Sequence, residues 1–183
     1  MVPQHQIRAR FDAQSIVVYQ AFNHAIAGAA VEAQRLVPPF SYGRMTWVKP
    51  SFLWMMERCG WASKPNQERV LAIHLARVRF DEAVAAAVST RVEHSHAAIR
   101  VQWDPERDLR GNKLTHRSLQ LGLGRPVCRA YATEWIVRVE DVTALVKRLD
   151  ALRKRGDHSA AAKLLPVERP YQSAGSVSVE LSK

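Results

Sequence analysis

The most constraining feature of this sequence is a change from extended chain to helix at Pro50. It lies within the stretch RMTWVKPSFLWMMERCGW, residues 44–61. A proline disfavours helical backbone at the residue before it, so residues 46–49 are expected to form a short strand. A helix is expected to begin near Pro50 or Ser51. Gly60 ends it, because glycine readily adopts the left-handed conformation found at helix C-termini.

This predicted helix carries a broad apolar face that is typical of a core helix. Its members are spaced i, i+1, i+3, i+4 and i+7. They are Phe52, Leu53, Met55, Met56 and Cys59. Packing in a hydrophobic core explains such a face without any ligand.

The segment before the helix is a better candidate for binding. Arg44 and Thr46 point to the same side of an extended chain. Lys49 and Ser51 flank the helix N-terminus, where free N–H groups and the helix dipole attract anions. Together they predict a phosphate or carboxylate site. The alternative is that Ser51 only caps the helix and Lys49 is solvated.

The net charge supports an anionic partner. The chain has 27 Lys+Arg against 17 Asp+Glu, a formal charge of +10 and a pI near 10.2. This excess favours nucleic acid, a nucleotide or phosphate as a partner. A basic surface that only keeps the protein soluble fits equally well.

The remaining composition indicates a cytoplasmic protein without a membrane segment. No apolar run approaches the roughly 20 residues of a membrane span. The N-terminus lacks the apolar region of a secretory signal. The two cysteines, Cys59 and Cys128, are expected to be reduced.

Strand and helix patterns along the chain predict an α+β fold. They do not alternate regularly, as a doubly wound sheet requires. We expect a single compact domain over residues 1–156, with a mixed, mostly antiparallel sheet flanked by helices. Residues 157–183 form a C-terminal extension, whose last dozen residues are expected to be mobile. Strands are predicted at 15–20, 46–49, 69–76 and 98–103, and helices at 23–35, 51–60, 80–89 and 141–155.

Three segments are harder to interpret from local pattern. Residues 104–108, DPERD, are typical of a turn, although their three carboxylates could instead hold Mg²⁺. Residues 116–124 fit either a strand or a short helix, and residues 129–140 are predicted as one or two strands. His94 and His96 are expected to be a solvated pair, and no metal site is predicted.

Several motifs together resemble domain-of-unknown-function family 4291. The resemblance implies one complete domain and supplies no catalytic residues. The motifs are IVVYQAF at 16–22, RMTWVKPSFLWMMERCGW at 44–61, QERVLAIHLAR at 67–77, VQWDPERD at 101–108 and WIVRVEDVT at 135–143.

The order of elements is also similar to that of ADP-ribosyltransferases. In that superfamily the first strand often carries a Tyr–His pair, where this chain has Tyr19–Gln20. A later Ser or Thr position corresponds to Thr46 or Ser51, and a late Glu or Gln position to Gln120. The histidine is absent and no glutamate stands clearly in place. The similarity implies nucleotide binding more than NAD⁺ chemistry.

Three functional hypotheses follow, of which the third is an interaction protein whose aromatic helix docks a partner. The first is a nucleotide-binding, enzyme-like domain, an ADP-ribosyltransferase-like transferase using NAD⁺, with Lys49 and Gln120 as catalytic candidates. Its cofactor-binding candidates are Tyr19, Gln20, Arg44, Thr46, Trp47, Ser51 and Arg69. The alternative is a non-catalytic module that binds RNA or DNA through its basic surface and exposed tryptophans.

Overall fold

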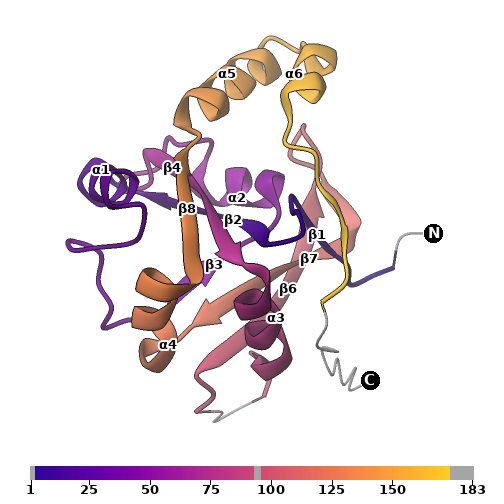
Figure 1. The fold of residues 1–183 in the computed structure, drawn as a ribbon. Helices are drawn as coiled ribbons and strands as arrows, with labels where there is room; N and C mark the ends of the chain where they lie inside the picture. The colour runs from indigo at the N-terminus through magenta and orange to yellow at the C-terminus, as the bar shows by residue number, and fades with distance from the viewer. Residues whose placement is uncertain (1–2, 93–95, 174–183) are drawn as a thin grey trace.

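The computed structural model describes residues 3–92 and 96–173, and the predicted α+β class is confirmed (Figure 1). The described residues form three mostly antiparallel sheets, with strand orders β1-β9, β2-β4-β8 and β3-β7-β6-β5. The last sheet is mixed, because β5 pairs with β6 in parallel. The strands are β1 (Ile7–Ala9), β2 (Ser15–Phe22), β3 (Thr46–Val48), β4 (Arg69–Ala76), β5 (Val88–Ser89), β6 (Ile99–Arg107), β7 (Lys113–Leu123), β8 (Ile136–Asp141) and β9 (Arg169–Tyr171). The helices are α1 (His24–Ala33), α2 (Phe52–Cys59), α3 (Arg77–Ala86), α4 (Arg125–Ala130), the π-helix η1 (Tyr131–Trp135), α5 (Thr143–Lys154) and α6 (His158–Leu164).

Strands β2 and β4 of the sheet β2-β4-β8 are buried on both faces. Successive residues of a strand point to opposite faces, so β2 contributes to two separate cores. Ile16 and Val18 belong to one core, whereas Val17 and Tyr19 belong to the other. This double burial explains why the sequences of β2 and β4 are almost continuously apolar.

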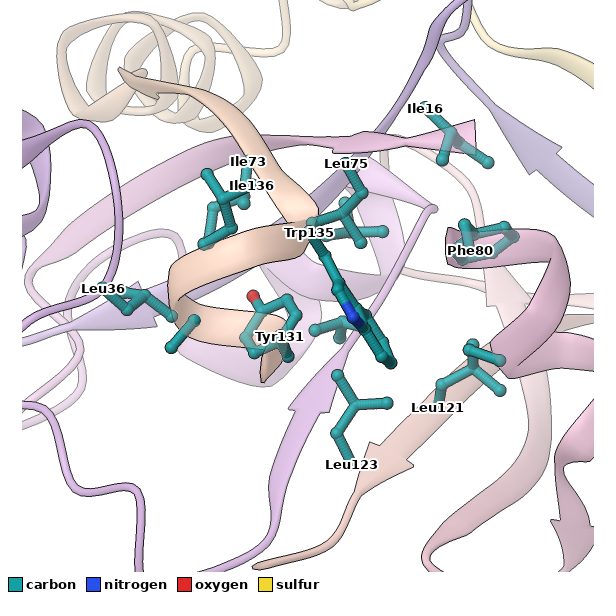
Figure 2. Close-up of a cluster of buried hydrophobic side chains, with 14 of the residues drawn as sticks. Ile16, Leu36, Ile73, Leu75, Phe80, Leu121, Leu123, Tyr131, Trp135 and Ile136 are labelled. Carbon is teal, nitrogen blue, oxygen red and sulfur yellow. The ribbon is translucent and has the colours of Figure 1, made fainter. Parts of the chain in front are cut away.

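The first core lies between this sheet, β7 and the α3, α4 and η1 helices. Figure 2 shows the Trp135 ring of η1 extending toward Leu123, with Leu121 and Phe80 beside it. Tyr131 packs edge-on against Trp135, with ring centroids 6.1 Å apart. The strand predicted at 129–140 is therefore wrong up to Trp135. Tyr131, Ala132 and Trp135 are buried whereas Glu134 is exposed, which is helical spacing, since a strand would bury alternate residues.

The second core contains the apolar face of α2, as predicted. Phe52, Met56 and Cys59 are fully buried and pack in one cluster with Val146 and Leu149 of α5. The ends of α2 also match the prediction. The Ser51 side chain caps its N-terminus, and Gly60 ends it with a left-handed φ of 59°.

The turn predicted at 104–108 is wrong, because β6 continues to Arg107. Asp104 and Pro105 pair with Ser118 and Arg117 of β7. Strand β5 reaches only Arg100 and Val101 of β6, so Pro105 lies where β6 pairs on one side only and its missing N–H costs little. The chain turns later, at 108–112.

Strand pairing decides the secondary structure of two further segments. Residues 116–124, which fitted two interpretations, belong mostly to strand β7. Helix α3 begins at Arg77, earlier than predicted, and ends at Ala86, because Val88 and Ser89 pair with β6.

The segment after residue 156 returns along the domain. Helix α6 lies beside α5, and the chain then descends to place β9 antiparallel to β1 (Figure 1). The mobility predicted for the last dozen residues concerns mainly 174–183, which lie outside the described residues, as does His94 of the predicted histidine pair. Every helix within the described ranges is too short or too polar to cross a membrane.

Candidate functional site

The two larger sheets meet at a single backbone bridge between Tyr19 and Lys49. The Tyr19 N–H donates to the Lys49 carbonyl oxygen at 2.7 Å. The bridge fixes the backbone of Lys49 immediately before Pro50 starts the turn into α2. It also fixes the orientation of β3 relative to β2.

Gln20 ties this junction together. Its Nε2 donates to Thr46 Oγ1 at 2.7 Å and to the Trp47 carbonyl at 2.9 Å. Its Oε1 accepts from the Tyr131 hydroxyl at 2.6 Å. Gln20 is only 4% exposed, and its amide is engaged at both ends, so it positions β3 and η1 relative to β2.

A pocket of about 600 Å³ opens beside the junction. It is lined by the end of β2, the start of α1, residues 40–47, α2 and the loop 64–67. The lining includes four cationic side chains and no aspartate or glutamate. These cations are Arg44, Lys49, Arg58 and Lys64. A concave lining of one charge sign concentrates its field and attracts ligands of opposite charge.

Three of these cations are unbalanced, in the sense that no group of the described residues pairs with them. Within the described part of the chain, the side chains of Arg44, Lys49 and Arg58 form neither an ion pair nor a hydrogen bond. Some basic side chains elsewhere form ion pairs, Arg69 with Asp141 for example, whereas others, such as Lys147 and Arg148 of α5, are exposed on the surface rather than gathered in a pocket. The positive charge of the pocket is therefore available to a ligand.

Lys49 is the most buried of the four, at 8% exposure. Its Nζ lies 5.2 Å from the centroid of the Trp54 ring, and the Arg58 guanidinium lies 5.8 Å from the same ring. Burial, together with the nearby Arg58 charge, lowers the pKa of Lys49 to about 8, although the Asp104 charge opposes the shift. Lys49 can therefore gain or lose its proton close to neutral pH.

A second pocket of about 320 Å³ adjoins the first. The two share Trp47, Lys49 and Arg58. The second adds Trp54, Gln102, Asp104 and Gln120. We call the two together the joined pockets.

The Asp104 carboxylate in the second pocket is held by two amides. Gln102 Nε2 donates to Oδ1 at 2.9 Å, and Gln120 Nε2 donates to Oδ2 at 2.7 Å. Gln102 and Gln120 are directly opposite each other on β6 and β7. Asp104 follows Gln102 by two residues and lies on the same face of the sheet. The carboxylate is thus fixed as an acceptor next to Lys49.

Trp47 packs over a glycine at the boundary between the pockets. It is directly opposite Gly122 in the β3–β7 pairing. A Cβ atom at Gly122 would approach the Trp47 ring to 2.8 Å and the Met45 sulfur to 2.9 Å. The absence of a side chain at Gly122 therefore lets the indole approach the strand backbone.

The N-terminus of α2, predicted to attract an external anion, is occupied by carboxylates of the chain itself. Ser51 Oγ accepts from the Trp54 N–H at 3.2 Å and donates to Glu106 Oε1 at 2.9 Å. The Phe52 N–H donates to Glu168 Oε1 at 2.7 Å. Burial, with a contribution from the nearby Glu106 charge, raises the pKa of Glu168 to about 8, although the hydrogen bond from the Phe52 N–H opposes the shift.

The predicted site residues separate into two groups. Six of them line the joined pockets: Gln20, Arg44, Thr46, Trp47, Lys49 and Gln120. Tyr19 lies in the second core, edge-on to Phe52 at 5.2 Å. Ser51 is the cap of α2, and the Arg69 guanidinium pairs with Asp141.

Sequence reasoning did not assign Arg58, Gln102 or Asp104 to the site. A signal for Arg58 was present, because it follows Trp54 by four residues on a predicted helix and must lie beside it. Gln102 and Asp104 had no such signal, since their place depends on the pairing of β6 with β7. The carboxylates of 104–108 diverge, with Glu106 directed to Ser51 and Asp108 to its own turn. Over residues 3–92 and 96–173, no group of three or more His, Cys, Asp or Glu could hold a metal ion.

Comparison with known proteins places the chain in a family. No curated protein matches it. The family described as Domain of unknown function (DUF4291) matches residues 6–171, which is most of the sequence. The match includes β1 to β9 and every residue of the joined pockets. The chain therefore belongs to the DUF4291 family.

Proposed function

We propose that this domain binds a phosphate-bearing nucleotide in the joined pockets and acts on it as an enzyme. The observation that carries the proposal is the larger pocket, with four cations, three of them unbalanced, and no acidic residue in its lining. Phosphate oxygens are the natural partners of such an arrangement, because guanidinium groups bind them with paired, charge-assisted hydrogen bonds.

The second pocket supports a nucleotide rather than a bare phosphate. Trp47 and Trp54 offer aromatic surface for a base, and Asp104 offers fixed acceptor oxygens for the hydroxyl groups of a ribose. Groups that suit phosphate, ribose and base thus occur in adjoining spaces.

NAD⁺ is the nucleotide to test first, because of the similarity to ADP-ribosyltransferases. Its pyrophosphate suits Arg44, Arg58 and Lys64. When bound, NAD⁺ supplies an ADP-ribosyl group for transfer. In this proposal Gln120 acts through Asp104, the carboxylate it holds, and Lys49 lies between the phosphate and ribose positions. A cytoplasmic location remains part of the proposal.

Nucleic-acid binding ranks second. The net charge of +10 favours it. All five tryptophans are among the described residues, and none is exposed: Trp54 and Trp135 are buried and the other three are half-buried. Stacking on unpaired bases would therefore depend on the partly accessible Trp47, Trp61 and Trp103, and Trp47 already lines the nucleotide pocket.

The test compares thermal unfolding with NAD⁺, ATP and GTP in matched variants. Arg44→Ala/Arg58→Ala removes two pocket cations. Lys147→Ala/Arg148→Ala removes two exposed cations of α5 and leaves the pocket intact. A ligand at 100 times its Kd stabilises the folded state by about 2.7 kcal/mol. We expect this shift in the wild type and in the α5 variant, and its loss in the pocket variant.

Two results would contradict the proposal. One is the absence of a shift with every nucleotide. The other is an equal shift in both variants. If both variants instead weaken binding to arbitrary RNA equally, with a steep dependence on salt, the nucleic-acid function gains support.

A further inference from the structure

We infer that Lys49 is an amine nucleophile that forms an imine with the carbonyl group of a phosphate-bearing aldehyde or ketone in the joined pockets. The inference rests on the proposed function for the placement of the phosphate. It adds a covalent step and a class of substrate that phosphate binding alone does not require.

The position of Lys49 is that of a reacting group. Among the described residues, only Lys49, Trp47 and Arg58 line both pockets. The Lys49 side chain is 92% removed from solvent yet reaches both spaces. Its backbone is fixed by the bridge to Tyr19, so the amine approaches the pocket from a rigid strand end.

The surroundings of Lys49 favour the neutral amine. Its Nζ forms no ion pair within the described residues, although the Asp104 charge acts on it, and it rests on the Trp54 ring with Arg58 on the same ring. Burial together with a neighbouring cation is the usual way in which proteins activate a lysine nucleophile. The pKa of about 8 leaves a much larger neutral fraction at physiological pH than an ordinary lysine, whose pKa is about 10.4.

The other cations of the larger pocket define the rest of the ligand. Arg44, Arg58 and Lys64 can hold a phosphate without Lys49. A ligand held in this way would present its other end toward Lys49 and the second pocket. The fitting substrate therefore carries a phosphate at one end and a carbonyl carbon at the other.

The step balances without a redox partner. The Lys49 nitrogen attacks the carbonyl carbon and forms a C–N bond, while the carbonyl oxygen takes up a proton and the nitrogen loses one. The resulting hydroxyl group then takes up the second proton of the nitrogen and leaves as water as the C=N bond forms. Asp104 is the carboxylate in the lining of the joined pockets, and it is the group we assign to accept and return the proton.

The test uses pyridoxal 5′-phosphate as the probe, reduction with borohydride and peptide mapping by mass spectrometry. We expect the reduced adduct mainly on Lys49, and its loss in Lys49→Arg. Lys64 is the internal control, because it lines the same larger pocket but is exposed. The labelling of Lys49 should rise with pH around a midpoint near 8. Equal labelling of Lys49 and Lys64, or unchanged total labelling in Lys49→Arg, would overturn the inference.

A second probe separates this inference from the proposed function. Pyridoxal lacks the phosphate, so it should label Lys49 more weakly than pyridoxal 5′-phosphate, and Arg44→Ala/Arg58→Ala should remove the difference. If both probes label Lys49 equally, the phosphate site is wrong and the nucleophile stands. If nucleotides stabilise the protein but neither probe labels Lys49, the nucleophile is wrong and the phosphate site stands.

Discussion

The two ends of the Lys49–Pro50–Ser51 segment differ in whether the chain itself supplies a partner for their polar and charged groups. On the Ser51 side, the N-terminus of α2 is satisfied by Glu106 and Glu168 of the chain itself. On the Lys49 side, the ammonium group and its neighbour Arg58 form no ion pair within the described residues, although the Asp104 charge acts on Lys49. A helix N-terminus attracts anions by its nature, but here that attraction serves folding. The ligand site is better identified by charge that the fold leaves unbalanced.

The largest expected effect concerns Ser51. Ser51→Ala removes the cap of α2 and leaves the buried Glu106 carboxylate without its hydroxyl donor. We expect a loss of roughly 2–4 kcal/mol in the free energy of unfolding. Denaturant titration measures it. Nucleotide affinity should be unchanged, so a large loss of affinity with little loss of stability would reverse the roles of the two ends.

A matched serine provides the control. Ser63 donates to the Gly60 carbonyl beyond the other end of α2 and is exposed. Ser63→Ala should change the free energy of unfolding by less than about 0.5 kcal/mol.

Lys49→Met should separate stability from binding. The variant replaces a buried ammonium group, which forms no ion pair, by an apolar side chain of similar length. We therefore expect the free energy of unfolding at neutral pH to rise by about 1 kcal/mol, with a higher Tm. Its affinity for the nucleotide should fall about 10- to 100-fold, the usual cost of a lost charge-assisted hydrogen bond. Calorimetry measures both quantities. A lower Tm with unchanged affinity would show that Lys49 is structural.

The carboxylates at the α2 N-terminus predict a pH dependence. Folded Glu168, with its pKa of about 8, keeps a proton that the unfolded chain releases above about pH 4.5. The folded state then binds more protons, so stability should fall as pH rises from about 4.5 to 8. In Glu168→Gln this component of the Tm profile should disappear. The exposed Glu134→Gln should retain it, and identical profiles for both variants would refute the assignment.

The smallest effect is expected at Gly122. In Gly122→Ala the new Cβ must displace the Trp47 ring or Met45 at the boundary of the pockets. We expect a loss of about 1 kcal/mol in stability, together with weaker nucleotide binding, because Trp47 lines both spaces. Unchanged affinity, measured by titration calorimetry, would remove Trp47 from the site.

Much of the fold could be predicted from local pattern. The strand around Val17 and the helix between Ser51 and Gly60 were predicted because proline, capping and periodicity act over a few residues. The errors at 104–108 and 129–140 have a common cause. Pairing with β7 keeps Asp104 in a strand despite its turn-like sequence, and burial of Trp135 in the first core favours helical spacing.

The site was less accessible to prediction, because ion pairing is set by tertiary structure. Arg58 and Arg69 look alike in sequence. Arg69 meets Asp141, 72 residues away, whereas Arg58 meets only the Trp54 ring and a pocket. Likewise, the carboxylate that occupies the α2 N-terminus comes from Glu168, 116 residues after Phe52. No local pattern shows which cations and which helix ends find a partner within the chain.

The most direct test of the unbalanced pocket is an NMR titration of the Lys49 side chain, assigned by comparison with Lys49→Arg. In the free protein, the Nζ group should titrate with a pKa near 8. Saturating nucleotide should raise that pKa, because a bound phosphate favours the charged amine. Titration near 10.4, the value of an ordinary lysine, with no change on adding nucleotide would contradict the account.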